Sequence, residues 1–166
     1  MLEYAWLIAV LPFLSFVINV ARRMKEPVPG YIGSALLGIV WLWSIAIAAT
    51  TLGQAGTSHT ATIEWMPGFR FGFQIDHLTT LMLIVVTSIS FATHVYSIGY
   101  MHGDEHFNVF FAYLGLFTSA MLWLVLADGF LLLLIAWELV GVSSYLLIGF
   151  WYRKPEAMQA AKKAFV

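Results

Sequence analysis

The apolar residues of this chain run together in long segments instead of alternating with polar residues. Five segments lack acidic and basic side chains almost entirely. Each contains roughly the 20 residues that a helix rising ~1.5 Å per residue needs to cross a ~30 Å hydrocarbon layer. We therefore predict an all-α transmembrane fold with five spanning helices, over residues 2–21, 31–52, 78–100, 109–127 and 130–152.

The pattern changes to a period of two between the second and third predicted spans. Ala61, Ile63 and Trp65 alternate with polar residues, and apolar side chains alternate again over 69–75, after the Met-Pro-Gly segment 66–68. Alternation on both sides of a Pro-Gly turn is typical of two antiparallel strands. We predict a small β-hairpin on the outer surface.

A further helix is expected at the end of the sequence. Residues 155–166 have a good helix-forming composition, with Pro155 near the first helical position. We interpret them as the start of a sixth helix. The sequence stops at Val166 without a helix cap, and we therefore expect residues 1–166 to be the N-terminal portion of a longer membrane subunit, with the remainder beyond Val166.

The positions of the cations predict the orientation of the spans. Lys and Arg near span ends are retained on the cytoplasmic side. Seven of the eight cations fall on one side only if the amino terminus is outside and the carboxyl terminus inside, with Arg70 alone on the outer face. These seven are Arg22, Arg23, Lys25, Arg153, Lys154, Lys162 and Lys163.

Composition excludes several classes of protein. The 166 residues are 61% hydrophobic and 10% charged, and the mean hydropathy is +0.85, far from the profile of a soluble domain. A net charge of −1 gives no basic patch for nucleic acid. Because the chain has no cysteine, it can form neither a disulfide nor a cysteine-ligated iron–sulfur cluster.

The most informative residue is Glu138, which lies inside the fifth predicted span. At ~1.5 Å per residue it is ~12 Å from the outer end of that span. An acidic group there costs at least ~2.5 kcal/mol on insertion scales, so it normally faces a bundle interior and either pairs or takes a proton. The alternative interpretation is a buried carboxyl that only bonds a neighbouring helix or stays neutral throughout.

Helical geometry places a stripe of residues on the same face as Glu138. At ~100° per residue, Gly141, Tyr145 and Gly149 share that face. The glycines leave room for a neighbouring helix or a short water file, and Tyr145 offers a hydroxyl further inward. His94, ~9 Å from the inner end of the third span, is a second candidate for proton relay. The alternative for His94 is a hydrogen bond to a neighbouring helix.

Two other polar features favour structural roles. The loop 102–106, His-Gly-Asp-Glu-His, contains metal-ligand residue types, but a short loop between spans needs such residues for turning and solvation. Asp76 and Asp128 each precede a span, where a carboxylate accepts hydrogen bonds from the first helical turn. We predict helix caps at both positions and no metal site.

Three stretches resemble a known family. They read YMHGD over 100–104, FFAYL over 110–114 and WELVGVSSYLLIGFWY over 137–152. Together they closely resemble the L subunit, an antiporter-like membrane subunit of the proton-translocating NADH–quinone oxidoreductase, respiratory complex I. The resemblance covers essentially the whole chain, and related antiporter-type subunits share the Trp-Glu-x-x-Gly stretch in part.

The resemblance implies a multi-pass protein of the cell (inner) membrane that contributes part of a proton path. In the family, the glutamate matching Glu138 pairs with a lysine of the seventh helix, beyond Val166. The family also implies partners among the other membrane subunits of complex I, including antiporter-like ones. No cofactor and no active site are expected in this chain, because the family places NADH, flavin (FMN), iron–sulfur clusters and quinone in partner subunits.

Two other functions remain open from the sequence. The first is the large subunit of a multi-subunit sodium/proton antiporter, which is similar over the same region. The second is a truncated, non-transporting membrane anchor or assembly fragment whose helices serve only packing. A glutamate without its partner cannot couple proton movement to a distant reaction, so we expect that residues 1–166 alone do not pump.

Overall fold

The computed structural model describes residues 2–22, 24–51, 58–66 and 69–165, with the side chains of 3, 63–66 and 69–70 left out of the description. The elements are α1 (Leu7–Ala21), α2 (Val28–Thr51), β1 (His59–Met66), β2 (Phe69–Ile75), α3 (His77–Tyr100), α4 (Phe107–Leu126), α5 (Phe130–Ile148) and α6 (Pro155–Phe165), and the 3-10 turn Leu2–Tyr4 precedes α1. The mostly helical fold with one hairpin confirms the predicted fold class.

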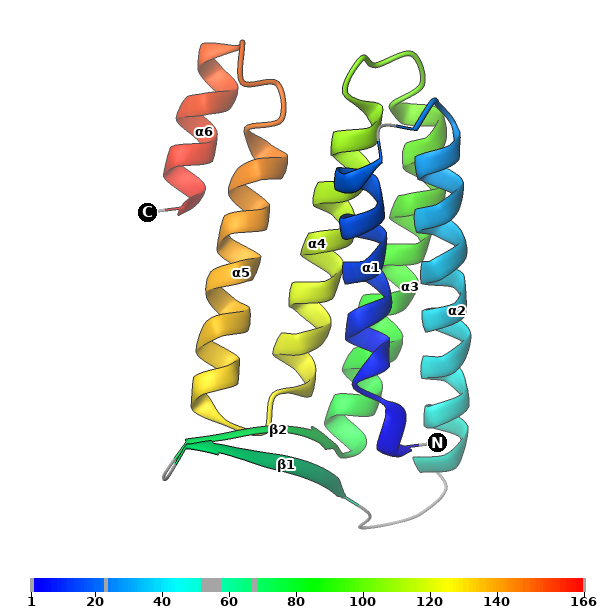
Figure 1. The fold of residues 1–166 in the computed structure, drawn as a ribbon, viewed down its shortest axis with the longest axis vertical. Coiled ribbons are helices and arrows are strands. Elements are labelled where there is room, and N and C mark those ends of the chain that lie inside the picture. The colour runs from blue at the N-terminus through cyan, green and yellow to red at the C-terminus, as the bar shows by residue number, and fades with distance from the viewer. Residues whose placement is uncertain (1, 23, 52–57, 67–68, 166) are drawn as a thin grey trace.

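The first four helices form an antiparallel bundle, and α5 and α6 are added to one side of it (Figure 1). The most extensive contacts join α1 to α4 and α2 to α3, and α5 packs on α4. After α5 the chain reverses, and α6 packs back against α5. Because α4 contacts α1, α2, α3 and α5, it is the central helix of the described structure.

The first helix is shorter than the sequence predicts. The apolar segment over 2–21 forms an α-helix only from Leu7, because the residues before it are held in tight turns by hydrogen bonds from Ala5 N–H to Leu2 C=O and from Ile8 N–H to Ala5 C=O. α2, α3, α4 and α5 are each long and apolar enough to cross a membrane, whereas α1 has 15 residues. The prediction of a spanning helix over all of 2–21 is therefore wrong at its start.

The fifth helix also ends earlier than predicted, at Ile148 instead of 152. Gly149 caps it, with its N–H bonded to the carbonyl of Tyr145. The chain then turns through Lys154, whose N–H donates to Trp151 C=O, before α6 begins. This turn brings α6 alongside α5.

The predicted hairpin is present between α2 and α3. β1 and β2 pair antiparallel, with His59 opposite Ile75 and Ala61 opposite Phe73. The predicted Pro67-Gly68 turn lies outside the described residues. The hairpin also contacts the turn between α4 and α5, through an isolated bridge from Phe73 to Ala127.

Two apolar clusters hold the bundle together. The larger one lies toward the hairpin and consists of Ala5, Ile8, Ala9, Val40, Ile47, Ile75, Leu83, Leu122 and Leu126. A smaller cluster at the opposite end contains Met101, Phe107 and Phe111. Between α1 and α4 the backbones approach closely at Gly115, where an added Cβ would lie 3.0 Å from the carbonyl oxygen of Pro12.

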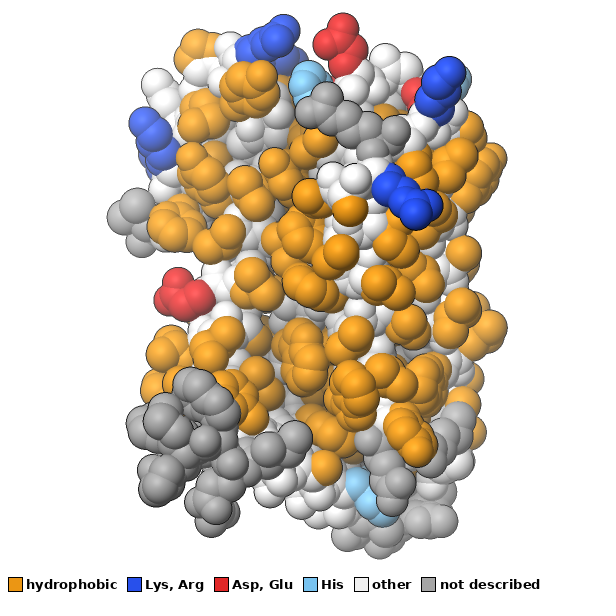
Figure 2. All heavy atoms as spheres, viewed as in Figure 1, with side chains coloured by type: hydrophobic (Ala, Val, Ile, Leu, Met, Phe, Trp, Pro, Cys, Tyr) orange, Lys and Arg blue, Asp and Glu red, His pale blue; other side chains and the backbone are white. Residues whose placement is uncertain are grey.

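The outer surface of the helices is apolar. Phe130 is 79% exposed and Trp137 63%, and Figure 2 shows apolar side chains over most of the visible face. Lys and Arg side chains gather toward the end opposite the hairpin. We call this the basic end. It carries Arg22, Lys25, Arg153 and Lys154, four of the seven cations that the sequence predicts on one side, whereas Lys162 and Lys163 lie in the last turn of α6, which runs back along α5. An apolar exterior with charged ends identifies a multi-pass membrane protein.

Candidate functional site

Glu138 lies on the side of α5 that faces away from the bundle. The buried residues of α5 are Ala136 and Ser143, which mark the side packed against its neighbours. Glu138 follows Ala136 by two positions, or about 200° around the helix, and its side chain is exposed. Within the described part of the chain, the side chain of Glu138 forms no hydrogen bond or ion pair. The four-helix bundle therefore does not provide its partner.

The predicted stripe around Glu138 is partly covered by α6. A Cβ on Gly149 would lie 3.3 Å from Ala161 Cβ, so this glycine admits a neighbouring helix as expected. The ring of Tyr145 packs edge-on against Phe165, at 5.8 Å between centroids. At Gly141, by contrast, an added Cβ would meet no described atom within 4 Å. α6 thus covers the stripe at Gly149 and Tyr145 and leaves Glu138 and Gly141 open.

His94 lies in a different place and is fully buried, with its ring next to Gly33 of α2 and Phe111 of α4. Its ring is 6.0 Å from that of Phe111 between centroids. Its Nδ1 is 2.9 Å from the carbonyl oxygen of Ser90, and because a carbonyl only accepts, Nδ1 carries the proton. No described residue provides a partner for Nε2. The structure does not bring His94 together with Glu138, so the two candidates belong to separate environments.

Further buried polar groups that sequence reasoning did not single out lie in the same four-helix bundle as His94. Asn19 and Ser34 are buried, and Asn108 donates through Nδ2 to the backbone carbonyl of Asn19. Each of these three has a buried oxygen without a hydrogen-bond partner among the described residues. An asparagine inside an apolar span could have indicated such a polar group, because amides in membranes normally form hydrogen bonds across helices.

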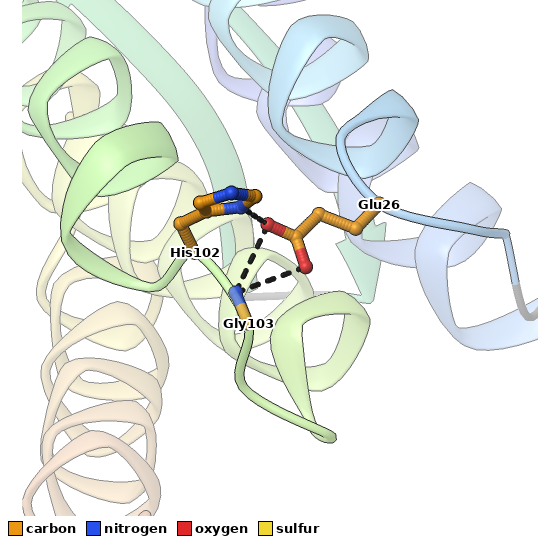
Figure 3. Close-up of polar contacts among 3 residues, drawn as sticks. All are labelled: Glu26, His102 and Gly103. Atoms are coloured by element: carbon orange, nitrogen blue, oxygen red, sulfur yellow. Dashed lines mark hydrogen bonds and ion pairs between the residues drawn. The ribbon is translucent and has the colours of Figure 1, made fainter.

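The loop over 102–106 is tied to the α1–α2 turn. Glu26 accepts hydrogen bonds from His102 Nδ1 and from the backbone N–H of Gly103, at 3.1 Å from each of its two oxygens (Figure 3). The His102 hydrogen bond, together with that of Gly103, lowers the pKa of Glu26 below its usual 4.5. No group of three or more His, Asp and Glu residues that could hold a metal ion occurs in the described ranges.

Only one of the two predicted carboxylate caps is formed. Asp76 Oδ1 accepts a 2.7 Å hydrogen bond from Thr79 N–H and caps α3. Asp128 does not cap α5, because Gly129 occupies the cap position. The backbone N–H of Asp128 instead donates to Gly72 C=O. The prediction for Asp128 is wrong because the hairpin binds the α4–α5 turn.

Two protein-family models match the chain. Residues 65–111 match the model described as NADH-ubiquinone oxidoreductase (complex I), chain 5 N-terminus. Residues 127–166 match the model described as NADH:quinone oxidoreductase/Mrp antiporter, TM. The second match contains α5 with Glu138, and the two together cover just over half of the chain.

The curated relatives match nearly the whole of this chain, but the match covers only part of their own length. The chloroplastic NAD(P)H-quinone oxidoreductase subunit 5 of Chlorokybus atmophyticus is 42% identical over 99% of this chain and 27% of its own length. The NADH-quinone oxidoreductase subunit L of Mycobacterium tuberculosis is 39% identical over 99% of the chain and 27% of its own. The chain thus spans about a quarter of the length of these relatives.

Solved structures agree on the fold. The chain is similar to the Mrp complex from a Dietzia species, with a TM-score of 0.79 and 26% identity over 96% of this chain and 17% of the other. An archaeal membrane-bound sulfane sulfur reductase gives a TM-score of 0.77 at 14% identity, over 95% of this chain and 24% of the other, which shows the fold alone. From both sequence and fold, the chain belongs to the complex I chain 5/subunit L family of antiporter-like membrane subunits and corresponds to its N-terminal region.

Proposed function

We propose that this chain contributes part of a proton-translocation path in an NADH–quinone oxidoreductase-type complex, with Glu138 as the residue that gains and loses the proton. Glu138 lies near the middle of the apolar helix α5. A carboxyl group at that depth costs at least ~2.5 kcal/mol on insertion scales and normally serves an ion or proton pathway. Electron transfer would take place in other subunits.

The observation that carries this proposal is the direction of Glu138. It lies on the side of α5 opposite the buried Ala136 and Ser143, and the neighbouring Gly141 is also uncovered by the described residues. A carboxyl group directed at lipid is strongly unfavourable, so this face is expected to meet more protein or a hydrated space. The relatives have about three quarters of their length outside the matched region, and that region is the expected source of a basic partner.

Tyr145 and His94 have subordinate roles in the proposal. Tyr145 lies two helical turns from Glu138, or ~10 Å along α5, on the stripe that α6 begins to cover. Its hydroxyl can pass a proton along that stripe. His94 is inside the neighbouring bundle and would serve as a relay separate from the Glu138 face.

The partners in this proposal are the other membrane subunits of the complex, including further antiporter-like ones. The chain contains no cysteine for an iron–sulfur cluster, so the redox cofactors would be held by those partners. The lipid bilayer covers the apolar exterior.

A second candidate function is sodium/proton exchange as the large subunit of an Mrp-type antiporter. The similarity to the Mrp complex, at 26% identity with a TM-score of 0.79, favours it. The two functions differ in the ion and in the driving reaction. Transport that requires sodium and proceeds without NADH oxidation would identify the antiporter.

The experiment is proton pumping by the assembled complex in proteoliposomes, with Glu138→Gln in the full-length subunit. We expect several-fold slower pumping at an NADH oxidation rate that stays close to wild type when the membrane is uncoupled. Glu156→Gln makes the same chemical change at an exposed position of α6 and should leave pumping unchanged. Wild-type pumping in Glu138→Gln would contradict the proposal and favour a non-transporting anchor.

A further inference from the structure

Polar side chains from all four bundle helices gather in the half of the bundle nearer the basic end. We call them the buried polar cluster. It consists of Ser15 and Asn19 on α1, Ser34 on α2 and His94 on α3, which are buried, and of the half-buried Asn108 on α4, whose Oδ1 atom is buried. Asn19 Nδ2 donates to Ser15 Oγ at 3.4 Å, and Asn108 Nδ2 donates to Asn19 C=O. The cluster is therefore continuous between α1 and α4.

His94 adjoins this cluster across a glycine of α2. A Cβ added to Gly33 would lie 3.1 Å from His94 Cδ2 and 3.4 Å from Ser15 Oγ. The imidazole of His94 and the hydroxyl of Ser15 thus both approach Gly33, where α2 packs closely against them. Ser34 is the next residue of α2 and is also buried.

The unpartnered atoms of the cluster are mostly acceptors. Asn19 Oδ1, Asn108 Oδ1, His94 Nε2 and Ser34 Oγ have no hydrogen-bond partner among the described residues. The first three can only accept, since His94 carries its proton on Nδ1. Acceptors cannot satisfy one another, and the Ser15 and Ser34 hydroxyls have two protons to give for three acceptors. Because each unsatisfied buried group costs ~1–3 kcal/mol, the cluster requires donors from another source.

The half of the bundle nearer the hairpin differs. Its buried hydroxyls have partners within the described residues. Ser44 donates to Val40 C=O at 2.9 Å, Thr87 to Leu83 C=O at 2.7 Å and Ser119 to Ala9 C=O at 2.7 Å, while Thr80 pairs with the hydroxyl of Thr51. The larger apolar cluster fills the space between these helices. Trp43 Nε1 is the exception, a donor without a partner among the described residues.

We propose that ordered water molecules occupy the buried polar cluster and connect His94 Nε2 with the basic end of the bundle. Water supplies the donors that the three acceptors need, and buried waters typically bond otherwise unsatisfied polar groups. Asn19 is two residues from the end of α1 and His94 is six from the end of α3, so the hydrated path would extend ~10 Å into the membrane. The apolar cluster closes it beyond His94.

The path would let protons reach His94 from the basic end alone. Proton delivery to His94 rests on the function proposed above, whereas hydration of the cluster does not. Hydration is tested by solvent exchange at His94, and the proposed function is tested separately by proton pumping.

The test is hydrogen–deuterium exchange at the imidazole Cε1 of each histidine, followed by mass spectrometry of the full complex in lipid nanodiscs. We expect His94 to exchange at a rate within about tenfold of that of the exposed His102. Complete protection of His94 after His102 has fully exchanged would overturn the proposal.

Asn19→Leu tests the path itself, because leucine keeps the branched shape and the number of side-chain heavy atoms of asparagine and removes both polar atoms. We expect exchange at His94 to slow by about tenfold or more, with the thermal midpoint recorded to verify folding. Ser44→Ala is the matched control, since Ser44 bonds only its own helix, and it should leave exchange unchanged. Unchanged exchange in Asn19→Leu together with increased stability would indicate a dry cluster and contradict the proposal. Glu138→Gln should leave His94 exchange unaltered whatever it does to pumping.

Discussion

The backbone N–H of Gly103 lies 3.1 Å from both carboxylate oxygens of Glu26. One side chain thereby joins the α1–α2 turn to the α3–α4 loop. Gly103 has a φ of +83°, a conformation that glycine adopts without steric cost. This conformation directs the Gly103 N–H at Glu26, while His102 Nδ1 approaches the same carboxylate.

Glu26→Gln should lower stability at neutral pH and make no difference in acid. The pKa of Glu26 in the folded chain is below its usual 4.5, so its contribution is fully present above that value and is lost as pH falls through the folded pKa. We expect the thermal midpoints of wild type and variant to differ at pH 7 and to converge below pH 4.5. Thermal unfolding of wild type and Glu26→Gln in nanodiscs across this pH range measures the difference between their midpoints.

The control for this prediction is Glu105→Gln, which changes an exposed acid of the same loop. Its thermal midpoint should follow wild type throughout. A Glu26→Gln variant that stays equally destabilised at pH 7 and below pH 4.5 would assign the effect to packing instead of charge.

Asp76→Ala should destabilise the start of α3. Loss of the hydrogen bond from Thr79 N–H removes the cap, which is worth ~1 kcal/mol in typical helices. Asp76→Asn keeps a cap acceptor and should retain most of the stability. Asp128→Ala should have little effect on α5, because Gly129 is its cap residue. Equal losses for Asp76→Ala and Asp128→Ala in chemical denaturation would contradict the assignment.

Gly115→Ala should separate α1 from α4. The added Cβ would lie 3.0 Å from Pro12 C=O and 3.3 Å from Phe16 N, both backbone atoms that cannot rotate away. Overpacking of this kind typically costs ~1–3 kcal/mol. Gly99→Ala adds the same methyl group where no described atom lies within 4 Å and should be neutral or slightly stabilising. Unfolding of the two variants side by side measures the difference.

A disulfide should form between α5 and α6 in the double variant Gly149→Cys and Ala161→Cys. The two Cβ positions are 3.3 Å apart, close to the ~3.5–4.5 Å of a disulfide. The chain has no other cysteine to compete. Gly141→Cys paired with Ala161→Cys should remain reduced, because Gly141 has no described neighbour within 4 Å. Thiol labelling after mild oxidation distinguishes the two, and equal labelling would refute the α5–α6 packing.

Much of the fold is predictable from the sequence because hydrophobic length and alternation are strong signals. The spans around His94 and Glu138 follow from apolar runs, and the hairpin follows from period-two alternation. The start of α1 does not follow, since the same apolar residues also form the tight turns before Leu7. Asp128 precedes a helix as Asp76 does, and only the tertiary contact with Gly72 separates the two.

The candidate site is less predictable than the fold. α5 has apolar residues on every side, so its periodicity does not indicate which face meets the bundle. The buried polar cluster depends on side chains such as Asn19, Ser34 and Asn108, which come from three different helices. Their proximity results from the packing of the helices against one another. It cannot be predicted from the sequence of any single span.

β2 connects α3 mechanically with α5. β2 is followed directly by α3, and Gly72 and Phe73 bond the turn that begins α5. A displacement at the Phe130 end of α5 is therefore transmitted through the main chain of β2 to the start of α3. Any rocking of the helix that carries Glu138 would move the helix that carries His94.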